Sequence, residues 1–317
     1  MMLNLIFNFF ILIISFYFLI KSSDYLISSS SILGERAGFS KFIIGLTLVA
    51  IGTSLPELFT SIIAIYSSKN SVAFIFGTVI GSNISNILLI FGILLLFSKK
   101  FKVDLKTIDI FFLLLSTLSL LFVIYIGSLT LIYGITYLLL FIIYLLVTIK
   151  FSSKKKFINE VEEVEETSIS YYSNYFLIII FLLSLIGLTI SAKTIVYSIE
   201  NLGKIFGIPI SILTLTTVAF ATSLPEMVVT IQSAKKKEFS LAVGNIIGSN
   251  ISNIFLIVGI SGILKQLIIK TSNYLMSIYF LLFTTLIFIF FLFKSDVKKY
   301  HSFIFFGFYL IYLYFIF

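Results

Sequence analysis

The chain carries the same two short motifs twice, and every copy lies within a long apolar stretch. TSLPE at residues 53–57 recurs 169 residues later at 222–226, and IGSNISNI at 80–87 recurs unchanged 167 residues later at 247–254. Each copy of TSLPE therefore places a glutamate, Glu57 or Glu226, inside a segment that a membrane would surround. A carboxylate at that depth costs roughly 2.5–3.5 kcal/mol on insertion scales unless something compensates it, so it marks a functional site by default.

The composition is that of a membrane protein. Hydrophobic residues make up 59% of the chain and charged residues only 11%, whereas about a quarter of the residues in a soluble domain are charged. We therefore expect an all-α polytopic membrane protein embedded in a lipid bilayer. The chain has no cysteine and one histidine, His301, which argues against a thiolate or imidazole metal site. The net charge of +8 does not indicate a nucleic-acid partner, because the lysines lie in short loops between apolar runs.

Ten transmembrane helices are expected, arranged as two halves. The first apolar run is interpreted as a retained helix and not a signal peptide, because it lacks a positive n-region and a small-residue cleavage site. A polar stretch divides the chain into a first five-helix repeat at 1–150, a cytoplasmic linker at 151–171 and a second five-helix repeat at 172–317. The expected helices lie at about 4–31, 40–67, 72–97, 108–126, 129–150, 173–200, 209–234, 240–264, 272–293 and 302–317.

The loop charges predict the orientation of these helices. One set of alternate loops holds 16 lysines and arginines and the other set holds 4, and cytoplasmic loops carry the excess. This bias places both termini outside the cell. Because each half has an odd number of helices, the halves must enter the membrane from opposite sides. The sequence thus predicts an inverted-topology repeat, a plan used by many secondary transporters.

The proline and glutamate of TSLPE suggest a cation site. Pro56 and Pro225 should break their helices and loosen the carbonyl groups just before them, and inside a membrane such groups need partners from protein, water or an ion. Two simpler explanations stay open at this point: hydroxyl groups nearby could satisfy the kinks, and Lys193 could pair with Glu226. A Lys193 pair would still leave Glu57 unexplained.

IGSNISNI adds amide and hydroxyl oxygens to this set. Ser82 and Asn86 share one helix face, as do Ser249 and Asn253. We interpret Gly81 and Gly248 as helix-packing positions, which is also the alternative interpretation for the serines. Asn86 and Asn253 are interpreted as ligands, because an amide deep in a bundle needs a partner. Carboxylate, hydroxyl and carbonyl oxygens are the ligands of hard cations such as Ca²⁺ and Na⁺.

These motifs resemble the cation/calcium antiporter superfamily, and specifically its prokaryotic sodium/calcium exchangers. Residues 45–91 and 214–258 are similar to the two α-repeats of that family, and the resemblance extends along the whole chain. It implies that Glu57 and Glu226 are central ligands shared by the calcium and sodium sites. It implies further ligands from backbone carbonyls, hydroxyls and amides, namely Ala50, Ala219, Thr53, Thr222, Ser54, Ser223, Ser82, Ser249, Asn86 and Asn253. Relatives often have aspartate at one of the two middle positions, where this chain has Asn86 and Asn253.

We therefore expect a secondary antiporter, and not an enzyme, that exchanges Na⁺ for Ca²⁺ by alternating access in a prokaryotic plasma membrane. The alternative is an H⁺/Ca²⁺ or broader divalent-cation exchanger. A cation channel is disfavoured because channel filters are usually built around a symmetric pore. We expect no cofactor beyond the transported ions, and a chain that functions as a monomer.

Overall fold

The computed structural model describes residues 2–67, 71–97, 106–151, 169, 171–206, 223–294 and 297–316. Each expected helix coincides with helical residues in these ranges, although 209–222 lie outside them, as does most of the 151–171 linker. Eight of the described helices are long and apolar enough to cross a membrane. The longest two, α1 (Met2–Arg36) and α9 (Asn174–Ile205), each extend about five residues beyond their expected carboxyl ends.

The remaining elements follow the order of the expected helices. In the first half they are α2 (Lys41–Ile44), η1 (Gly45–Val49), α3 (Ala50–Thr53), α4 (Leu55–Ser67), α5 (Ser71–Ser85), η2 (Asn86–Ile90), α6 (Phe91–Phe97), α7 (Thr107–Ile126), β1 (Ser128–Leu129) and α8 (Leu131–Phe151). In the second half they are α11 (Leu224–Lys235), α12 (Phe239–Ser252), η3 (Asn253–Val258), α13 (Gly259–Leu264), β2 (Leu267–Ile268), η4 (Thr271–Asn273), α14 (Leu275–Phe293), η5 (Lys299–His301) and α15 (Ser302–Ile316).

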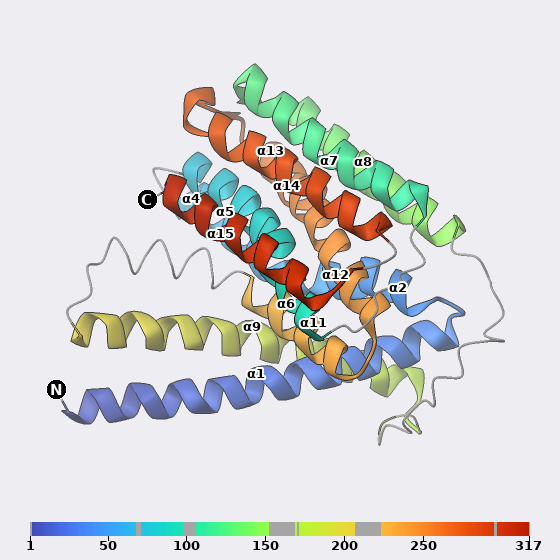
Figure 1. Ribbon diagram of the computed structural model, residues 1–317, viewed down its shortest axis with the longest axis vertical. Helices are drawn as coiled ribbons and strands as arrows, with labels where there is room; N and C mark the ends of the chain where they lie inside the picture. The colour runs from blue at the N-terminus through green and yellow to red at the C-terminus, as the bar shows by residue number, and fades with distance from the viewer. Residues whose placement is uncertain are drawn as a thin grey trace.

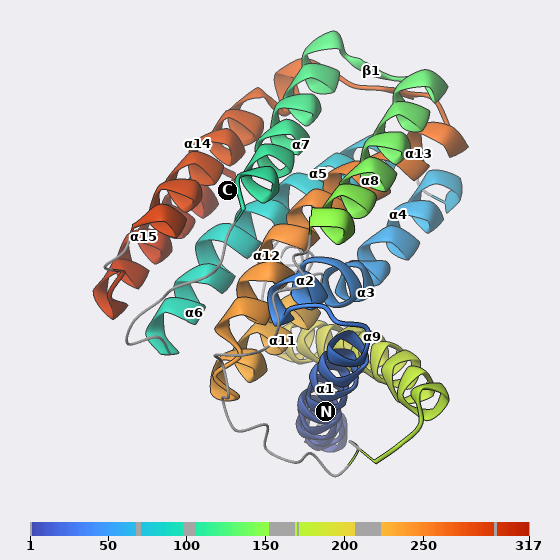
Figure 2. The same cartoon turned by 90° about the vertical axis from the view of Figure 1, so that its right-hand side faces the viewer.

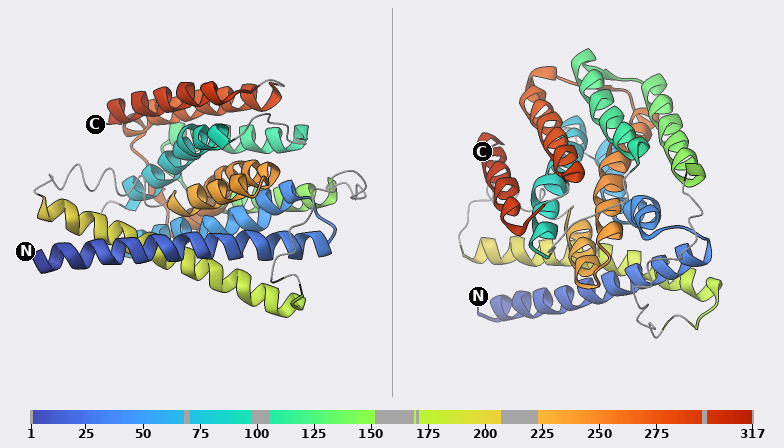
Figure 3. Two further views of the ribbon diagram at one scale, coloured as in Figure 1. Left: turned by 60° about the horizontal axis from the view of Figure 1, so that its bottom comes forward. Right: turned by 45° about the vertical axis from the view of Figure 1, so that its right-hand side comes forward.

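Helices α1 and α9 form a pair that lies beside the other helices. They run in opposite directions along one side of the molecule (Figures 1 and 3). A separate buried cluster joins this pair to the rest of the chain, with Leu26 from α1, Leu188 from α9 and Val228 from α11 among its members. Each half thus contributes one helix, α1 or α9, that lies outside the central bundle.

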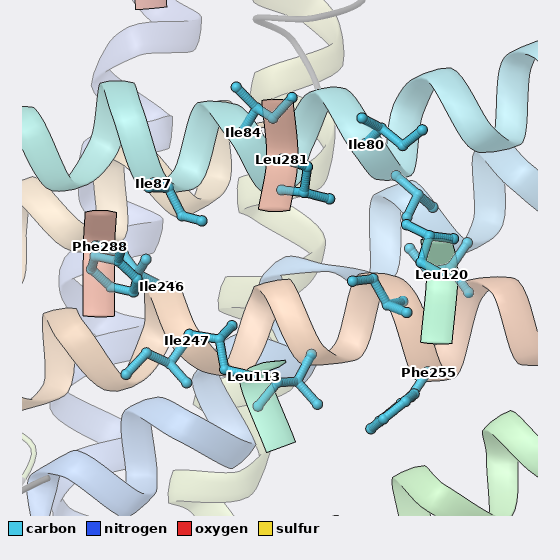
Figure 4. Packing of buried hydrophobic residues seen from close by; sticks show 14 of the residues in the cluster. Ile80, Ile84, Ile87, Leu113, Leu120, Ile246, Ile247, Phe255, Leu281 and Phe288 are labelled. Atoms are coloured by element: carbon cyan, nitrogen blue, oxygen red, sulfur yellow. The ribbon is translucent and has the colours of Figure 1, made fainter. Parts of the chain in front are cut away.

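The central bundle is built from helices of both halves packed on one another. Helix α12 of the second half packs against α2, η1 and α3 of the first half. One large apolar cluster fills the bundle, and Figure 4 shows residues of both repeats within it, including Ile84 beside Leu281 and Ile247 near Leu113. The repeated isoleucines of IGSNISNI thus supply core contacts in both halves, and the serines and asparagines of the motif are not part of this apolar cluster.

Close backbone contact brings α12 against the first half. A Cβ atom on Gly248 would lie 2.2 Å from the carbonyl oxygen of Leu46, and one on Gly45 would lie 2.2 Å from the carbonyl oxygen of Leu241. Only glycine permits helices to approach this closely. The packing interpretation of Gly248 is confirmed. A Cβ atom on Gly81 would lie 4.0 Å from Tyr312 Oη. The counterpart of Leu46 in the second half, residue 215, lies outside the described residues.

A short antiparallel bridge also joins the two halves at one end of the bundle. Strand β1 pairs with β2, with Ser128 opposite Ile268 and Leu129 opposite Leu267 (Figure 2). Gly127 precedes the bridge in the left-handed conformation, at φ 78°. The sequence analysis did not predict this bridge, because two-residue strands leave no periodic pattern.

Candidate cation site

The TSLPE motif interrupts its helix where the proline predicts a break. Helix α3 ends at Thr53 and α4 begins at Leu55, with Ser54 as a turn between them. The carbonyl oxygen of Ala50 accepts two hydrogen bonds at this break, from the Ser54 N–H at 3.1 Å and the Thr53 hydroxyl at 3.3 Å. In this conformation the Ala50 carbonyl is therefore already satisfied within its own segment. The second half shows the same turn, with Ser223 preceding α11, whereas Ala219 and Thr222 lie outside the described residues.

The two glutamates lie in the first turns of α4 and α11 and are buried. Glu57 is 0% exposed and Glu226 is 1% exposed. Neither carboxylate has a hydrogen-bond partner among the described residues, and the two groups are close enough to repel each other electrostatically. The ion pairs of the described chain join Lys41 to Glu238 and Lys236 to Asp24. Lys193 is exposed on α9, so the alternative in which it pairs with Glu226 is excluded.

Hydroxyl groups of the first break lie near the Glu226 carboxylate. Thr53 and Ser54 of the first half approach the Glu226 carboxylate of the second half, although not at the distance and angle of a hydrogen bond. The buried hydroxyl oxygens of Ser54 and Ser223 have no hydrogen-bond partner in the described chain. Helix α12 contacts Thr53 through Ser249, whose Oγ lies 3.4 Å from the Thr53 hydroxyl oxygen. The remaining predicted hydroxyl ligand, Ser82, is buried on α5.

Four asparagines of the two IGSNISNI copies form a crossed hydrogen-bond network. Asn83 Nδ2 donates to the main-chain oxygen of Asn250 at 3.1 Å, and Asn250 Nδ2 donates to the main-chain oxygen of Asn83 at 3.3 Å. Asn86 Nδ2 donates to Asn250 Oδ1 at 2.9 Å, and Asn253 Nδ2 donates to Asn83 Oδ1 at 3.1 Å. The side-chain oxygens of Asn86 and Asn253 are left buried without a partner.

The two copies of the motif also share a local distortion of the helix. The α-helix changes to π-helical turns at Asn86 in η2 and at Asn253 in η3. Such turns are rare and appear mostly at functional sites. Helix α4 packs against η3 and α11 packs against η2, so each glutamate-bearing helix contacts the distorted turn of the opposite half.

The site is therefore rich in acceptors and offers only oxygen. Its unpartnered atoms are the oxygens of Glu57, Glu226, Asn86 and Asn253 and of the two serines after the helix breaks. Buried polar groups normally have partners, so this concentration of orphaned oxygens needs an explanation. A hard cation supplies one, because it binds carboxylate, carbonyl and hydroxyl oxygens. Within the described ranges, no cluster of three or more His, Cys, Asp or Glu residues exists that would hold a softer metal.

Comparison with known proteins identifies the family. The family model for "Sodium/calcium exchanger protein" matches residues 7–150 and 176–317. The chain belongs to the sodium/calcium exchanger family. Curated relatives include the sodium/calcium exchanger MaX1 of Methanosarcina acetivorans, 46% identical over 27% of this chain and 24% of that protein. The inner membrane protein YrbG of Escherichia coli is 32% identical over 59% of each chain. The matched segments thus span less than two thirds of the length of these relatives.

The likeness to solved structures extends over the whole exchanger fold. The sodium-calcium exchanger NCX_Mj, from a crystal soaked with 2.5 mM Na⁺ and 0.1 mM Ca²⁺, superposes with a TM-score of 0.79 at 28% identity. The match covers 97% of this chain and 98% of that chain. The expected fold class and the expected superfamily are confirmed, as is the expectation of a transporter family in place of an enzyme family. The boundaries of the two repeats and the individual ligand assignments stay predictions.

Sequence reasoning missed three asparagines that build the site. Asn83 and Asn250 were noted within the repeat but not assigned a role, although the unchanged repetition of both asparagines was the available signal. Asn245 carried no such signal, because the equivalent position of the first half is Thr78. In the structure Asn245 Oδ1 lies 3.3 Å from the Thr53 hydroxyl and shares its single proton with the Ala50 carbonyl, so Asn245 contacts the helix break of the opposite half.

Proposed function

We propose that this chain exchanges Na⁺ for Ca²⁺ across a prokaryotic plasma membrane, at a site formed by Glu57, Glu226 and the surrounding Ser, Thr and Asn oxygens. The observation that carries the proposal is the pair of buried carboxylates without partners among the described residues, one from each half. Two carboxylates balance the charge of one Ca²⁺, and Ca²⁺ takes about six to eight oxygen ligands. Na⁺ favours the same type of ligand, so the two ions would compete for overlapping oxygens.

The arrangement of the site favours alternating access. Each half contributes one glutamate, one broken helix and one asparagine motif, so a single central site is shared by two inverted halves. The site residues that the structure describes are buried in this conformation, as expected of an occluded state of the cycle. The NCX_Mj structures concern extracellular ion exchange and induced binding-site occlusion in that protein. We propose the same type of cycle here, with both chain termini outside the cell and the monomer as the functional unit.

The test is uptake of radioactive Ca²⁺ into proteoliposomes that contain the purified chain and are loaded with Na⁺. Uptake should require internal Na⁺, saturate with external Ca²⁺ and disappear in both Glu57→Gln and Glu226→Gln. Asp24→Asn is the matched control, because it removes an acidic charge outside the site, where Asp24 pairs with Lys236. The control should retain uptake.

The same assay separates the alternatives. Uptake driven by a pH gradient and indifferent to Na⁺ would replace the proposal with H⁺/Ca²⁺ exchange. A requirement for K⁺ would indicate potassium-linked exchange, a possibility raised by the similarity to the human sodium/potassium/calcium exchanger 5, which is 30% identical over 32% of this chain. Uptake that is indifferent to every counter-ion would refute an antiporter.

A further inference from the structure

The crossed asparagine network connects ligands of one half to side chains of the other half. The Asn253 side chain of the second half donates a hydrogen bond to Asn83 of the first half. The Asn86 side chain of the first half donates one to Asn250 of the second half. All four side chains are 1% exposed. Each of these hydrogen bonds joins the two halves, so each asparagine is oriented by the opposite motif copy.

We propose that Asn83 and Asn250 are positioning residues that act across the two halves. Asn83 turns the carbonyl oxygen of Asn253 toward the ion, and Asn250 does the same for Asn86. This role rests on the proposed cation exchange, and it extends that function to residues outside the predicted ligand set.

The physical basis is that an asparagine amide presents a donor at one end and an acceptor at the other. A cation is bound by the carbonyl oxygen and repelled by the NH₂ group, so the rotation of the amide decides whether the residue helps or hinders binding. Asn83 commits its own NH₂ group to the main-chain oxygen of Asn250. Its Oδ1 must then face Asn253, where it accepts from the Asn253 NH₂ group.

A fixed main-chain carbonyl therefore orients one amide, and that amide orients the next. The result is visible in the partners: the NH₂ groups of Asn86 and Asn253 are occupied, while their Oδ1 atoms have no described partner. Without Asn83, nothing in the described network would prevent the Asn253 amide from rotating by half a turn. The same reasoning applies to Asn250 and Asn86.

The test is a set of double-mutant cycles, read as equilibrium binding of radioactive Ca²⁺ to the purified full chain in detergent. Asn83→Ala should raise the Ca²⁺ dissociation constant about five- to tenfold, the equivalent of losing one orienting hydrogen bond. In an Asn253→Ala background the same change should have less than about a twofold effect, because no amide remains to be oriented. In an Asn86→Ala background the full effect should persist.

The mirror cycle reverses these partners: Asn250→Ala should lose its effect in Asn86→Ala and keep it in Asn253→Ala. A merely structural role would give the same loss in both backgrounds, so equal losses would overturn the assignment. Ser85→Ala is the matched control, since Ser85 lies between Asn83 and Asn86 in the sequence and is buried, but its hydroxyl contacts Tyr309 at 3.4 Å instead. If Asn83→Ala does not fold, Asn83→Ser replaces it with a side chain too short to reach Asn253.

The failure of the inference and of the proposed function can be told apart. A wild-type chain that binds neither Ca²⁺ nor Na⁺ would overturn the proposed function, and this role with it. A wild-type chain that binds Ca²⁺ but shows no coupling between positions 83 and 253 would overturn only the positioning role.

Discussion

Gly244 offers a sharp test of how the two halves are held together. A Cβ atom at this position would lie 2.3 Å from the main-chain oxygen of Phe42 and 2.8 Å from the amide nitrogen of Leu46. Neither is the flexible end of a side chain, so Gly244→Ala can be accommodated only if α12 moves away from α2 and η1. Gly77 occupies the equivalent position in the first half, 167 residues earlier, and a Cβ atom there meets none of the described residues within 4 Å.

We expect the two substitutions to change the stability of the chain in opposite directions. Replacing a helical glycine by alanine gains about 1 kcal/mol from helix propensity, which Gly77→Ala should largely keep. At Gly244 the added methyl group must move a packed helix by about 1 Å, and overpacking of this kind costs about 1–3 kcal/mol. Because Gly248 and Gly45 lie in the same contact, the shift spreads along α12, and the cost should lie at the upper end of this range. After the gain in helix propensity is subtracted, we expect a net loss of about 2 kcal/mol.

Thermal unfolding of the purified chain measures the difference. The chain has no tryptophan and no cysteine, so far-ultraviolet circular dichroism is preferable to tryptophan fluorescence or thiol dyes. We expect Gly244→Ala to lower Tm by about 4–8 °C, at 2–4 °C for each kcal/mol, and Gly77→Ala to leave Tm unchanged or raise it. A Tm that is unchanged or raised in Gly244→Ala would refute the close approach of α12 to the first half.

Three further changes have expected outcomes in the same assay. Gly127→Ala should lower stability by about 1–2 kcal/mol, because Gly127 adopts the left-handed conformation at φ 78°. Tyr144→Phe should cost about 1 kcal/mol, because the buried hydroxyl donates to the main-chain oxygen of Leu46 at 3.1 Å. Glu238→Gln should cost about 1 kcal/mol through loss of the partly buried pair with Lys41 at 3.2 Å. The Glu238→Gln deficit should shrink as salt is raised, and a deficit independent of salt would contradict its electrostatic origin.

The helices and the halves could be predicted from sequence because their signals are local. Long apolar runs specify helices in a membrane whatever their neighbours are, since every backbone group must be satisfied within the segment. The prolines of TSLPE likewise predicted the break at Ser54, because the clash that a proline ring creates lies within its own helix. These predictions depended on the chain near each residue and needed no knowledge of packing.

The parts that could not be predicted depend on contacts between distant segments. Gly77 and Gly244 occupy the same position of the repeat, yet among the described residues only Gly244 lies against a neighbouring backbone. The carbonyl of Ala50 was expected to be loosened, but a side chain three residues away also binds it. The role of Asn245 depends on its contact with Thr53, 192 residues earlier in the chain. No local pattern contains such information.

The network of asparagines shows how the fold can make a cation site from neutral groups. The donor ends of all four amides are occupied by contacts between the two halves, while two acceptor ends remain without a described partner. If both ends were satisfied, the amides would serve only to join the halves and would offer nothing to an ion. If neither end were satisfied, each amide could rotate and would attract anions and cations alike. Occupying only the donors leaves two amide oxygens free in the candidate site with Glu57 and Glu226, and such a surplus of acceptors would favour a positive charge.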